Sequence, residues 1–526
     1  MRVNAVARGV IGATAIVLTL VVVPVGTAAQ RYVDTEPAAE YRAKDFVLEW
    51  LSNPDVEEKY GMMSDAIWSY AELGMQEFRS AKVLTDDLEQ NGFQVERGVS
   101  GMPTAFVATW GSGRPVVGLM AEYDALPGLS QQGDVPHQAP LVPGAPGHGC
   151  GHNQQGPAVI PAALALKAAM EEFGIGGTIK VFGGPAEETL ISRVYMARDH
   201  LFDDLDVVLS NHGGTELGTR YGVSGDAIFS TVFTFRGETA HAAGSPWTAR
   251  SAQDAVEIMN VAANYLREHL FYTYRMHYVV IEAGEAPNVV PDYARVWYFT
   301  RNTDDRVEEM HEKVINCARA AALATGTEMS YRVLSAAHQS RAPKSLAVLA
   351  QRNIELVGMP EWTEEEQAFA KEMQRELGKE ETGLPTEVSE LRYWDSTTTF
   401  TGGGSSDIAD LQMQTANVTV SIPGDVPGDI GHHWSRTAGN FGSATHKGII
   451  ANAKVLAATL LDLLTIPEEL RLVRDEFEQQ AAEHPYKTFL PDGAEPPIDL
   501  NKELMEKWRP LMEPFYLPFP GMEIVR

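Results

Sequence analysis

A glycine-rich segment at residues 147–153 carries a thiol and two imidazoles directly before a predicted helix. Cys150 and His152 lie two residues apart on this predicted turn, so both side chains can face one cation. Thiolate and imidazole are ligands that suit zinc and related transition metals. The segment therefore indicates a metal site, and the alternative is a glycine-rich helix entry in which the histidines are incidental.

A pair of adjacent acids, Glu187 and Glu188, follows a predicted strand at residues 178–182. Adjacent side chains at a strand end point in different directions, so one carboxylate can bind a metal while the other faces an attacking water. Hydrolysis needs a base beside that water, and a carboxylate can serve as one. Taken alone, the pair fits a solvated acidic loop as well.

Three more polar residues occupy similar places. His212 follows a short apolar run, His446 opens the last long predicted helix of the core, and Asp124 follows a predicted strand at residues 115–119. Lone histidines are more often structural than ligands, and Asp124 alone fits a capped turn. All five segments nevertheless stand at a strand's carboxyl end or a helix start, the edge where open α/β sheets place their sites. We therefore expect them to converge, with Asp124 placed to orient a metal-bound imidazole.

The elements that must position these residues alternate between strand and helix over residues 43–222. Amphipathic periodicity predicts helices at residues 46–51, 62–73, 80–91 and 157–173. Short apolar runs predict strands at residues 104–109, 115–119, 178–182 and 207–209. The alternation returns later, with helices at 344–357 and 446–464 and a strand at 417–421. This order predicts an α/β domain with a mostly parallel sheet and helices on both faces.

A different pattern interrupts this domain at residues 223–337. Its predicted elements follow the order β-α-β-β-α-β of a ferredoxin-like unit. We therefore expect two halves of one domain, residues 30–222 and 338–466, with a compact unit inserted between them. Residues 467–526 form a polar C-terminal extension with several prolines.

Bulk composition excludes some functions. The 526 residues carry a net charge of −29, which disfavours binding to nucleic acid phosphates. Two cysteines exclude a disulfide framework.

The N-terminus has the layout of a secretory signal peptide over residues 1–29. Arg2 and Arg8 precede an apolar run at residues 10–25, and small residues follow at 27–29. We expect a secreted or periplasmic protein, and the alternative is an uncleaved membrane anchor.

Six motifs together resemble metallopeptidase family twenty, the aminoacylase- and carboxypeptidase-like amidohydrolases, and especially its p-aminobenzoyl-glutamate hydrolase-like members. The motifs are AEYDALPG, GHGCGHN, GGPAEET, AHAAGSPWTARSAQDAV, APNVVPDYA and ATHKG, and the likeness spans about residues 43–464. The resemblance implies a metallohydrolase catalytic domain with an inserted lid or dimerisation domain. It also implies two divalent metal ions, with zinc favoured by the thiolate and manganese as the alternative. The implied ligands are Cys150, His152, Glu188, His212 and His446.

The same resemblance assigns roles to other residues. Glu187 is the implied general base, and Asp124 the implied orienting acid for His152. Relatives with other metal sets place a histidine ligand where Glu122 stands, so Glu122 is a weaker ligand candidate. His241 matches a lid histidine that reaches the scissile carbonyl, often in the partner subunit. Three residues are candidate substrate contacts, of which the first two face the substrate's carboxylate: Asn288, Arg301 and His432.

The resulting prediction is an amidohydrolase that cuts an N-acyl or aminoacyl amino acid, such as a p-aminobenzoyl-glutamate-like amide, and forms a homodimer through the lid. A dipeptidase or carboxypeptidase using the same residues is the alternative within enzymes. The alternative of another class is a non-catalytic, metal-dependent binding protein. Glu187 argues against the last, because a protein that only binds needs no such base.

Overall fold

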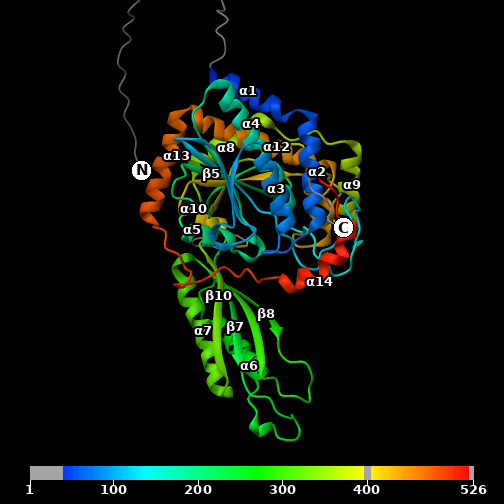
Figure 1. The fold of residues 1–526 in the computed structure, drawn as a ribbon, viewed down its shortest axis with the longest axis vertical. Helices are drawn as coiled ribbons and strands as arrows, with labels where there is room; N and C mark the ends of the chain where they lie inside the picture. The colour runs from blue at the N-terminus through cyan, green and yellow to red at the C-terminus, as the bar shows by residue number, and fades with distance from the viewer. Residues whose placement is uncertain (1–38, 396–403, 520–526) are drawn as a thin grey trace, which may run out of the picture. The chain divides into compact units, whose positions relative to one another are not determined.

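The computed structural model describes residues 39–395 and 404–519 (Figure 1). The signal peptide that we predict at residues 1–29 lies outside them. The central feature is a six-stranded sheet in the order β1-β2-β4-β3-β5-β13. Strands β4, β3, β5 and β13 are parallel, and β2 and β1 add antiparallel strands at one edge. The strands are β1 (Gln94–Arg97), β2 (Phe106–Ser112), β3 (Val116–Ala121), β4 (Gly177–Gly183), β5 (Val207–Gly214) and β13 (Asn417–Pro423).

Helices cover both faces of this sheet. β3 is buried along its whole length, and its side chains alternate between two apolar cores. Val117 and Leu119 belong to the core shared with α4 and α12, whereas Met120 belongs to the core shared with α5. Such alternation is expected of a central parallel strand covered on both sides, so the predicted α/β fold is confirmed. The helices are α1 (Ala39–Leu51), α2 (Pro54–Tyr70), α3 (Phe78–Gln90), α4 (Gln155–Phe173), α5 (Ser192–Arg198), α8 (Lys344–Val357), α9 (Glu364–Glu376), α10 (Ile408–Gln412), α11 (Trp434–Gly439) and α12 (Ser443–Thr465).

The inserted unit, which we call the lid, has its own antiparallel sheet in the order β10-β7-β9-β8 (green in Figure 1). Its helices α6 and α7 share an apolar core with β7 and β9. The predicted order β-α-β-β-α-β is confirmed, with both helices packed on the sheet. The elements are β7 (Ala227–Arg236), α6 (Ala252–Leu266), β8 (Arg275–Glu282), β9 (Tyr293–Asn302), α7 (Asp304–Thr325) and β10 (Glu328–Ala337).

A third, small sheet was not predicted from the sequence. It joins β6 (Arg220–Ser224), β11 (Ser340–Ala342) and β12 (Arg392–Asp395), with β6 in the centre. β6 leads into the lid strand β7, and β11 follows the lid strand β10, so this sheet directly adjoins both connections to the lid. We call it the wall sheet, because one of its faces borders the cavity described below.

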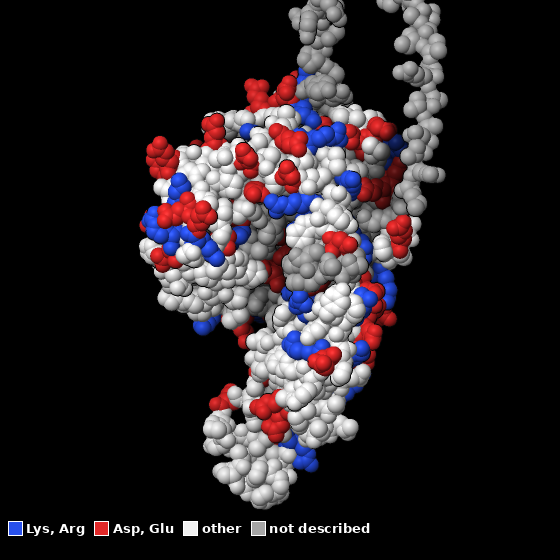
Figure 2. Space-filling view, turned by 180° about the vertical axis from the view of Figure 1, so that it is seen from behind, with Lys and Arg blue, Asp and Glu red and all other residues white. Residues whose placement is uncertain are grey.

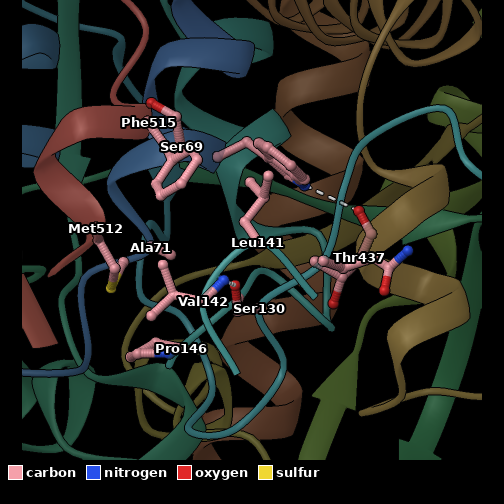
Figure 3. Close-up of a pocket in the computed structure, with 12 residues that line it drawn as sticks. Ser69, Ala71, Ser130, Leu141, Val142, Pro146, Thr437, Met512 and Phe515 are labelled. Carbon is pink, nitrogen blue, oxygen red and sulfur yellow. Dashed lines mark hydrogen bonds between the residues drawn. The ribbon is translucent and has the colours of Figure 1, made fainter. Parts of the chain in front are cut away.

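The C-terminal extension is folded onto the catalytic domain rather than extended. It contains α13 (Pro467–Glu483) and α14 (Lys502–Met512). Met512 and Phe515 lie against the loop that carries Ser130 and Val142 and enclose a cavity of about 20 Å³ (Figure 3). That volume suits about one water molecule, so the cavity is a packing detail and not a ligand site.

One helix of the described chain, α12, is long and apolar enough to cross a membrane. Of its apolar window 83% is buried inside the protein, as expected for a core helix of a globular domain. On the face shown in Figure 2, acidic and basic side chains are interspersed. The surface in that view therefore offers no continuous basic face of the kind that binds nucleic acid.

Candidate metal centre

Four segments of the catalytic domain meet at the carboxyl end of the parallel strands. Glu122 and Asp124 follow β3, the pair Glu187 and Glu188 follows β4, and His212 lies near the end of β5. Cys150 and His152 stand directly before α4. Neighbouring parallel strands end at one edge, so a fold of this kind gathers these side chains in one place.

The sulfur and two imidazoles form the first group of ligand-type atoms. Cys150 Sγ lies 3.5 Å from His212 Nε2, and the rings of His152 and His212 lie 5.5 Å apart. Ligand atoms of these three residues all lie within 4.8 Å of one another. A cation placed among them would meet the donor set that suits zinc.

The loop that carries Cys150 and His152 is held from several sides. Asn153 donates to Asn440 O at 2.9 Å, and Asn440 donates to His148 O at 2.8 Å. His148 Nε2 donates to Ile67 O at 3.1 Å, and burial lowers the pKa of His148 to about 3. His148 is therefore a neutral structural histidine, and these hydrogen bonds hold the loop in place.

Asp124 orients the histidine as expected. Its Oδ1 lies 2.9 Å from His152 Nδ1, and its Oδ2 accepts from the Glu188 backbone N–H at 3.0 Å. The Nδ1 contact leaves His152 Nε2 free to face the group described above. A carboxylate behind a ligating histidine fixes its tautomer and raises its basicity.

A strained turn presents the two glutamates. Ala186 has φ of 56°, a left-handed conformation that non-glycine residues rarely adopt, and its N–H donates to Glu77 Oε1 at 2.8 Å. This hydrogen bond from the Ala186 backbone to the buried Glu77 carboxylate holds the turn in place. Burial, and after it the charge of Glu122, raises the pKa of Glu187 well above its ordinary value.

A fully buried arginine that we did not predict from the sequence stands beside these acids. The Arg193 guanidinium contacts Glu122 and Asp407, and Arg193 Nη2 lies 3.6 Å from Glu187 Oε1. Although burial opposes it, Arg193 lowers the pKa of Glu122 to about 2. Glu122 also accepts from Gln155 at 2.5 Å, so both of its oxygens have protein partners. This pairing favours a supporting role for Glu122 over that of a ligand.

The histidine expected to complete the ligand set, His446, is not brought to this cluster. Its Nε2 lies 3.0 Å from Asp65 Oδ2, and its ring packs against Gly61 of α2. In the described part of the chain it belongs to no group of ligand atoms within 4.8 Å. The physical reason is the orientation of His446 in the first turn of α12. Its side chain faces α2 and points away from the ends of the strands.

His432 stands where His446 was expected. Its Nε2 lies 3.3 Å from Glu188 Oε2, and it forms a second group with Cys150 and Glu188. Its backbone N–H donates to Gly149 O at 3.0 Å, so the loop is fastened to the cysteine loop. The sequence signal was the Gly-His-His-Trp segment, in which the doubled histidine obscured the register.

The lid residues are divided between two places. Arg301 lines the same cavity as the cluster, and its Nη1 donates to Ser405 Oγ at 3.3 Å. His241 and Asn288 are exposed and lie beside each other on the lid, where the Ala242 N–H donates to Asn288 O at 3.0 Å. Neither lines that cavity within this chain.

The donor set fits metal ions. His152 Nε2 and Glu188 Oε1 are buried without a hydrogen-bond partner, which is costly unless a ligand satisfies them. Burial raises the pKa of Cys150 to about 12, so a thiolate there needs a cation beside it. Burial and the charge of His152 lower the pKa of His212 to about 4, which leaves a neutral imidazole able to bind metal at pH 7.

Comparison with known proteins identifies the family. A family model described as a peptidase dimerisation domain matches residues 227–325, which are lid residues. The chain is 34% identical over 466 residues to one of the two subunits of p-aminobenzoyl-glutamate hydrolase from Escherichia coli, covering 84% of this chain and 96% of that protein. The chain belongs to the M20 family. It is accordingly a hydrolase that acts on amide bonds, as the resemblance implied.

Other known proteins are similar to this chain in sequence or in fold. Human Xaa-Arg dipeptidase is 26% identical over 453 residues, covering 82% of this chain and 91% of that protein. An aminobenzoyl-glutamate utilization protein from Klebsiella pneumoniae has the same fold, with a TM-score of 0.56 and 18% identity over 79% of this chain and 97% of that one. A putative aminohydrolase from Staphylococcus aureus gives a TM-score of 0.55 and 16% identity over 80% of this chain and 100% of that one.

Proposed function

We propose that this M20 hydrolase binds two divalent metal ions and cuts the amide bond of an N-acyl or aminoacyl amino acid. The observation that carries the proposal is the convergence of two overlapping groups of ligand-type residues, with Glu187 beside them. The groups are Cys150, His152 and His212, and Cys150, Glu188 and His432. Similarity to the p-aminobenzoyl-glutamate hydrolase of Escherichia coli supports an amide whose leaving group is an amino acid.

The ligand set that we propose differs from the expected one at a single position. His432 takes the place assigned to His446, because it shares a ligand group with Cys150 and Glu188 whereas His446 pairs with Asp65. The thiolate favours zinc, and manganese is the alternative. When bound, such ions supply Lewis acidity and lower the pKa of a coordinated water from about 15.7 toward 7.

The residues of the chain perform the proton transfers. Glu187 Oε2 lies 3.7 Å from His152 Nε2, so its carboxylate borders the place where the ligand atoms converge. From there it accepts a proton from the attacking water. Glu187 then passes this proton to the leaving nitrogen. Arg193, on the other side, holds the carboxylate in position.

The lid contributes the substrate contacts in this proposal. Arg301 has a buried Nε without a partner among the described residues, so it can bind the carboxylate of the leaving amino acid. The partner subunit's His241 reaches the scissile carbonyl, as in the family pattern. One oxyanion donor of this kind contributes about 2.7–4 kcal/mol to catalysis.

A homodimer through the lid is part of the proposal. β8 is the outer strand of the lid sheet, and Tyr278, Val279, Val280 and Ile281 along it are 37%, 53%, 42% and 41% exposed. An apolar outer strand with free backbone groups readily pairs with another strand. The match to a peptidase dimerisation domain supports a second copy as the partner. We also propose secretion or export to the periplasm, from the predicted signal peptide.

The test uses the full chain loaded with zinc and a panel of N-acyl amino acids, p-aminobenzoyl-glutamate and dipeptides. We expect hydrolysis that a chelator abolishes. Glu187→Gln should keep its metal and lose nearly all turnover, because the base is gone but the ligands remain. Retained turnover in that variant, or no chelator-sensitive hydrolysis at all, would contradict the proposal. The panel also distinguishes an acyl-amino acid hydrolase from a dipeptidase.

Metal analysis tests the ligand assignment separately. We expect His432→Ala to bind less metal than the natural chain, with binding lowered about 10-fold or more. His446→Ala is the matched control and should keep its full metal content. The reverse result would restore His446 as the ligand.

A further inference from the structure

The cavity that contains the metal-centre residues has a second wall, formed by the wall sheet. The cavity measures about 480 Å³. Alternate residues of the wall sheet line it, as expected for one face of a pleated sheet. They are Arg220, Gly222 and Ser224 on β6, Ser340 and Ala342 on β11, and Trp394 on β12. Four of these six side chains are small, so the wall leaves room for a ligand.

Arg220 is the cation of this wall, and none of the described residues is an acidic partner for it. Its guanidinium lies 5.1 Å from the centre of the Trp394 ring, and it makes no ion pair or hydrogen bond with the described residues. Its cross-strand neighbour Arg392 differs, because Arg392 Nη2 lies 2.7 Å from Glu216 Oε2. Arg220 is exposed to solvent, and the like charge of Arg392 beside it disfavours its charged form. An anion in the cavity would relieve that unfavourable charge.

Arg220 is the first residue of β6, whereas Arg301, on the lid strand β9, lies near the other end of β6. Next to Arg220, Thr219 bridges to Val420, which pairs with Asn211 directly before His212. At the other end of β6, the Asp226 N–H donates to Gly404 O at 3.3 Å, and Arg301 donates to the adjacent Ser405. Four residues of strand span about 13 Å. The cavity therefore has one guanidinium on the His212 side and another on the side of the lid, and neither forms an ion pair with the described residues.

We propose that Arg220, held against Trp394, binds a second carboxylate of the substrate, so that preferred substrates carry two acid groups. The inference rests on the proposed function, in which Arg301 takes the first carboxylate. A guanidinium presents a planar fork of donors that matches a carboxylate in two hydrogen bonds. The second carboxylate belongs either to the side chain of an acidic leaving amino acid or to the acyl group.

Two matched substrate pairs distinguish these sources. N-benzoyl-Glu is compared with N-benzoyl-Gln, and N-(4-carboxybenzoyl)-Ala with N-benzoyl-Ala, by kcat/KM. The natural chain should prefer the acid in at least one pair. Arg220→Met should reduce that preference roughly 10- to 100-fold, the usual effect of losing a hydrogen bond to a charged group. Arg220→Lys keeps the charge and should retain part of the preference.

Arg392→Met is the matched control, because Arg392 lies beside Arg220 but pairs with Glu216 and does not line the cavity. It should keep the preference of the natural chain. Metal content and the unfolding midpoint show whether Arg220→Met is folded, and Arg220→Lys reports on the site if it is not. The inference is overturned if the natural chain shows no preference for the acid in either pair, or if the preference survives in Arg220→Met. A chain that hydrolyses neither these four amides nor any member of the panel described above would instead refute the proposed function, and this inference with it.

Discussion

Replacing Arg193 with methionine should destabilise the catalytic domain by about 3–5 kcal/mol, the usual cost of removing one partner from a buried ion pair. The Arg193 side chain is 0% exposed, and its guanidinium contacts Glu122 and Asp407. Methionine retains much of the apolar volume but leaves both buried carboxylates without a cation. Protonation limits the cost, because burial disfavours a carboxylate more than a neutral carboxyl.

The assay is urea unfolding of the metal-free protein at pH 7, followed by circular dichroism. A loss of 3–5 kcal/mol raises the population of unfolded molecules by about two to four orders of magnitude. The matched control is Arg319→Met, because Arg319 and Glu312 form an ion pair with side chains 51% and 54% exposed. Exposed pairs contribute about 0–1 kcal/mol, so this control should unfold close to the natural chain.

Acid pH gives a second measurement on the same variant. Burial opposes ionisation of Glu122, but Arg193 and then His152 lower its pKa from 4.5 to about 2. A carboxyl whose pKa is lowered by folding stabilises the protein above its unfolded-state pKa and loses that contribution as the pH falls. The difference in the free energy of unfolding between the natural chain and Arg193→Met should therefore become smaller as the pH falls from 4.5 toward 2. A loss below about 1 kcal/mol at pH 7, or a gap that stays constant, would refute this account of the cluster.

Two other expectations concern single residues. In a Cys317→Ser chain, thiol reagents should modify Cys150 much faster after chelation, since a ligand thiolate is protected, and equal rates with and without metal would argue against ligation. His338 Nε2 donates to Lys487 O, and although burial opposes it, Asp304 and Asp410 raise the His338 pKa from 6.5 to about 9. Because folding raises its pKa, His338 stabilises the folded protein fully below pH 6.5 and loses this contribution as the pH rises to 9. Over that window, the free energy of unfolding measured in urea should fall by about 3 kcal/mol more for the natural chain than for His338→Gln. Parallel curves for the two chains would contradict this role for His338.

Most residues of the candidate metal centre could be predicted from the sequence, because sites of α/β sheets lie at the carboxyl ends of the parallel strands. Asp124, Glu188 and His212 follow or end parallel strands, and Cys150 and His152 precede a helix on the same edge. His446 was assigned by the resemblance of a motif at a helix start. A helix start fixes where a residue lies along the axis but not which side of the helix it faces, and this one faces Asp65.

The wall sheet and the buried arginine were not predictable by the same means. β6, β11 and β12 have five, three and four residues, too few to show an alternating pattern. They come from places at least fifty residues apart in the chain, so no hairpin signal links them. Arg193 stands in a short helix whose other residues are mostly apolar, and its partner Asp407 is over two hundred residues away.

The wall sheet also adjoins both connections to the lid. β6 reaches β7 through Gly225 and Asp226, and β10 reaches β11 through His338 and Gln339. The Gln339 side chain donates to Gly225 O at 3.1 Å, which joins the two connections. Rotation of the lid must therefore bend the chain at these few residues, next to the wall of the cavity.

Arg220 and Arg301 lie on opposite sides of this hinge, since Arg220 belongs to the wall sheet and Arg301 to the lid strand β9. A substrate held at both ends would connect the two bodies and oppose their separation. Binding energy from carboxylates remote from the scissile bond would then contribute to closing the site around it. If substrate is held at both arginines, as we propose, its binding opposes opening of the lid, and losing the contact at Arg220 should weaken that effect.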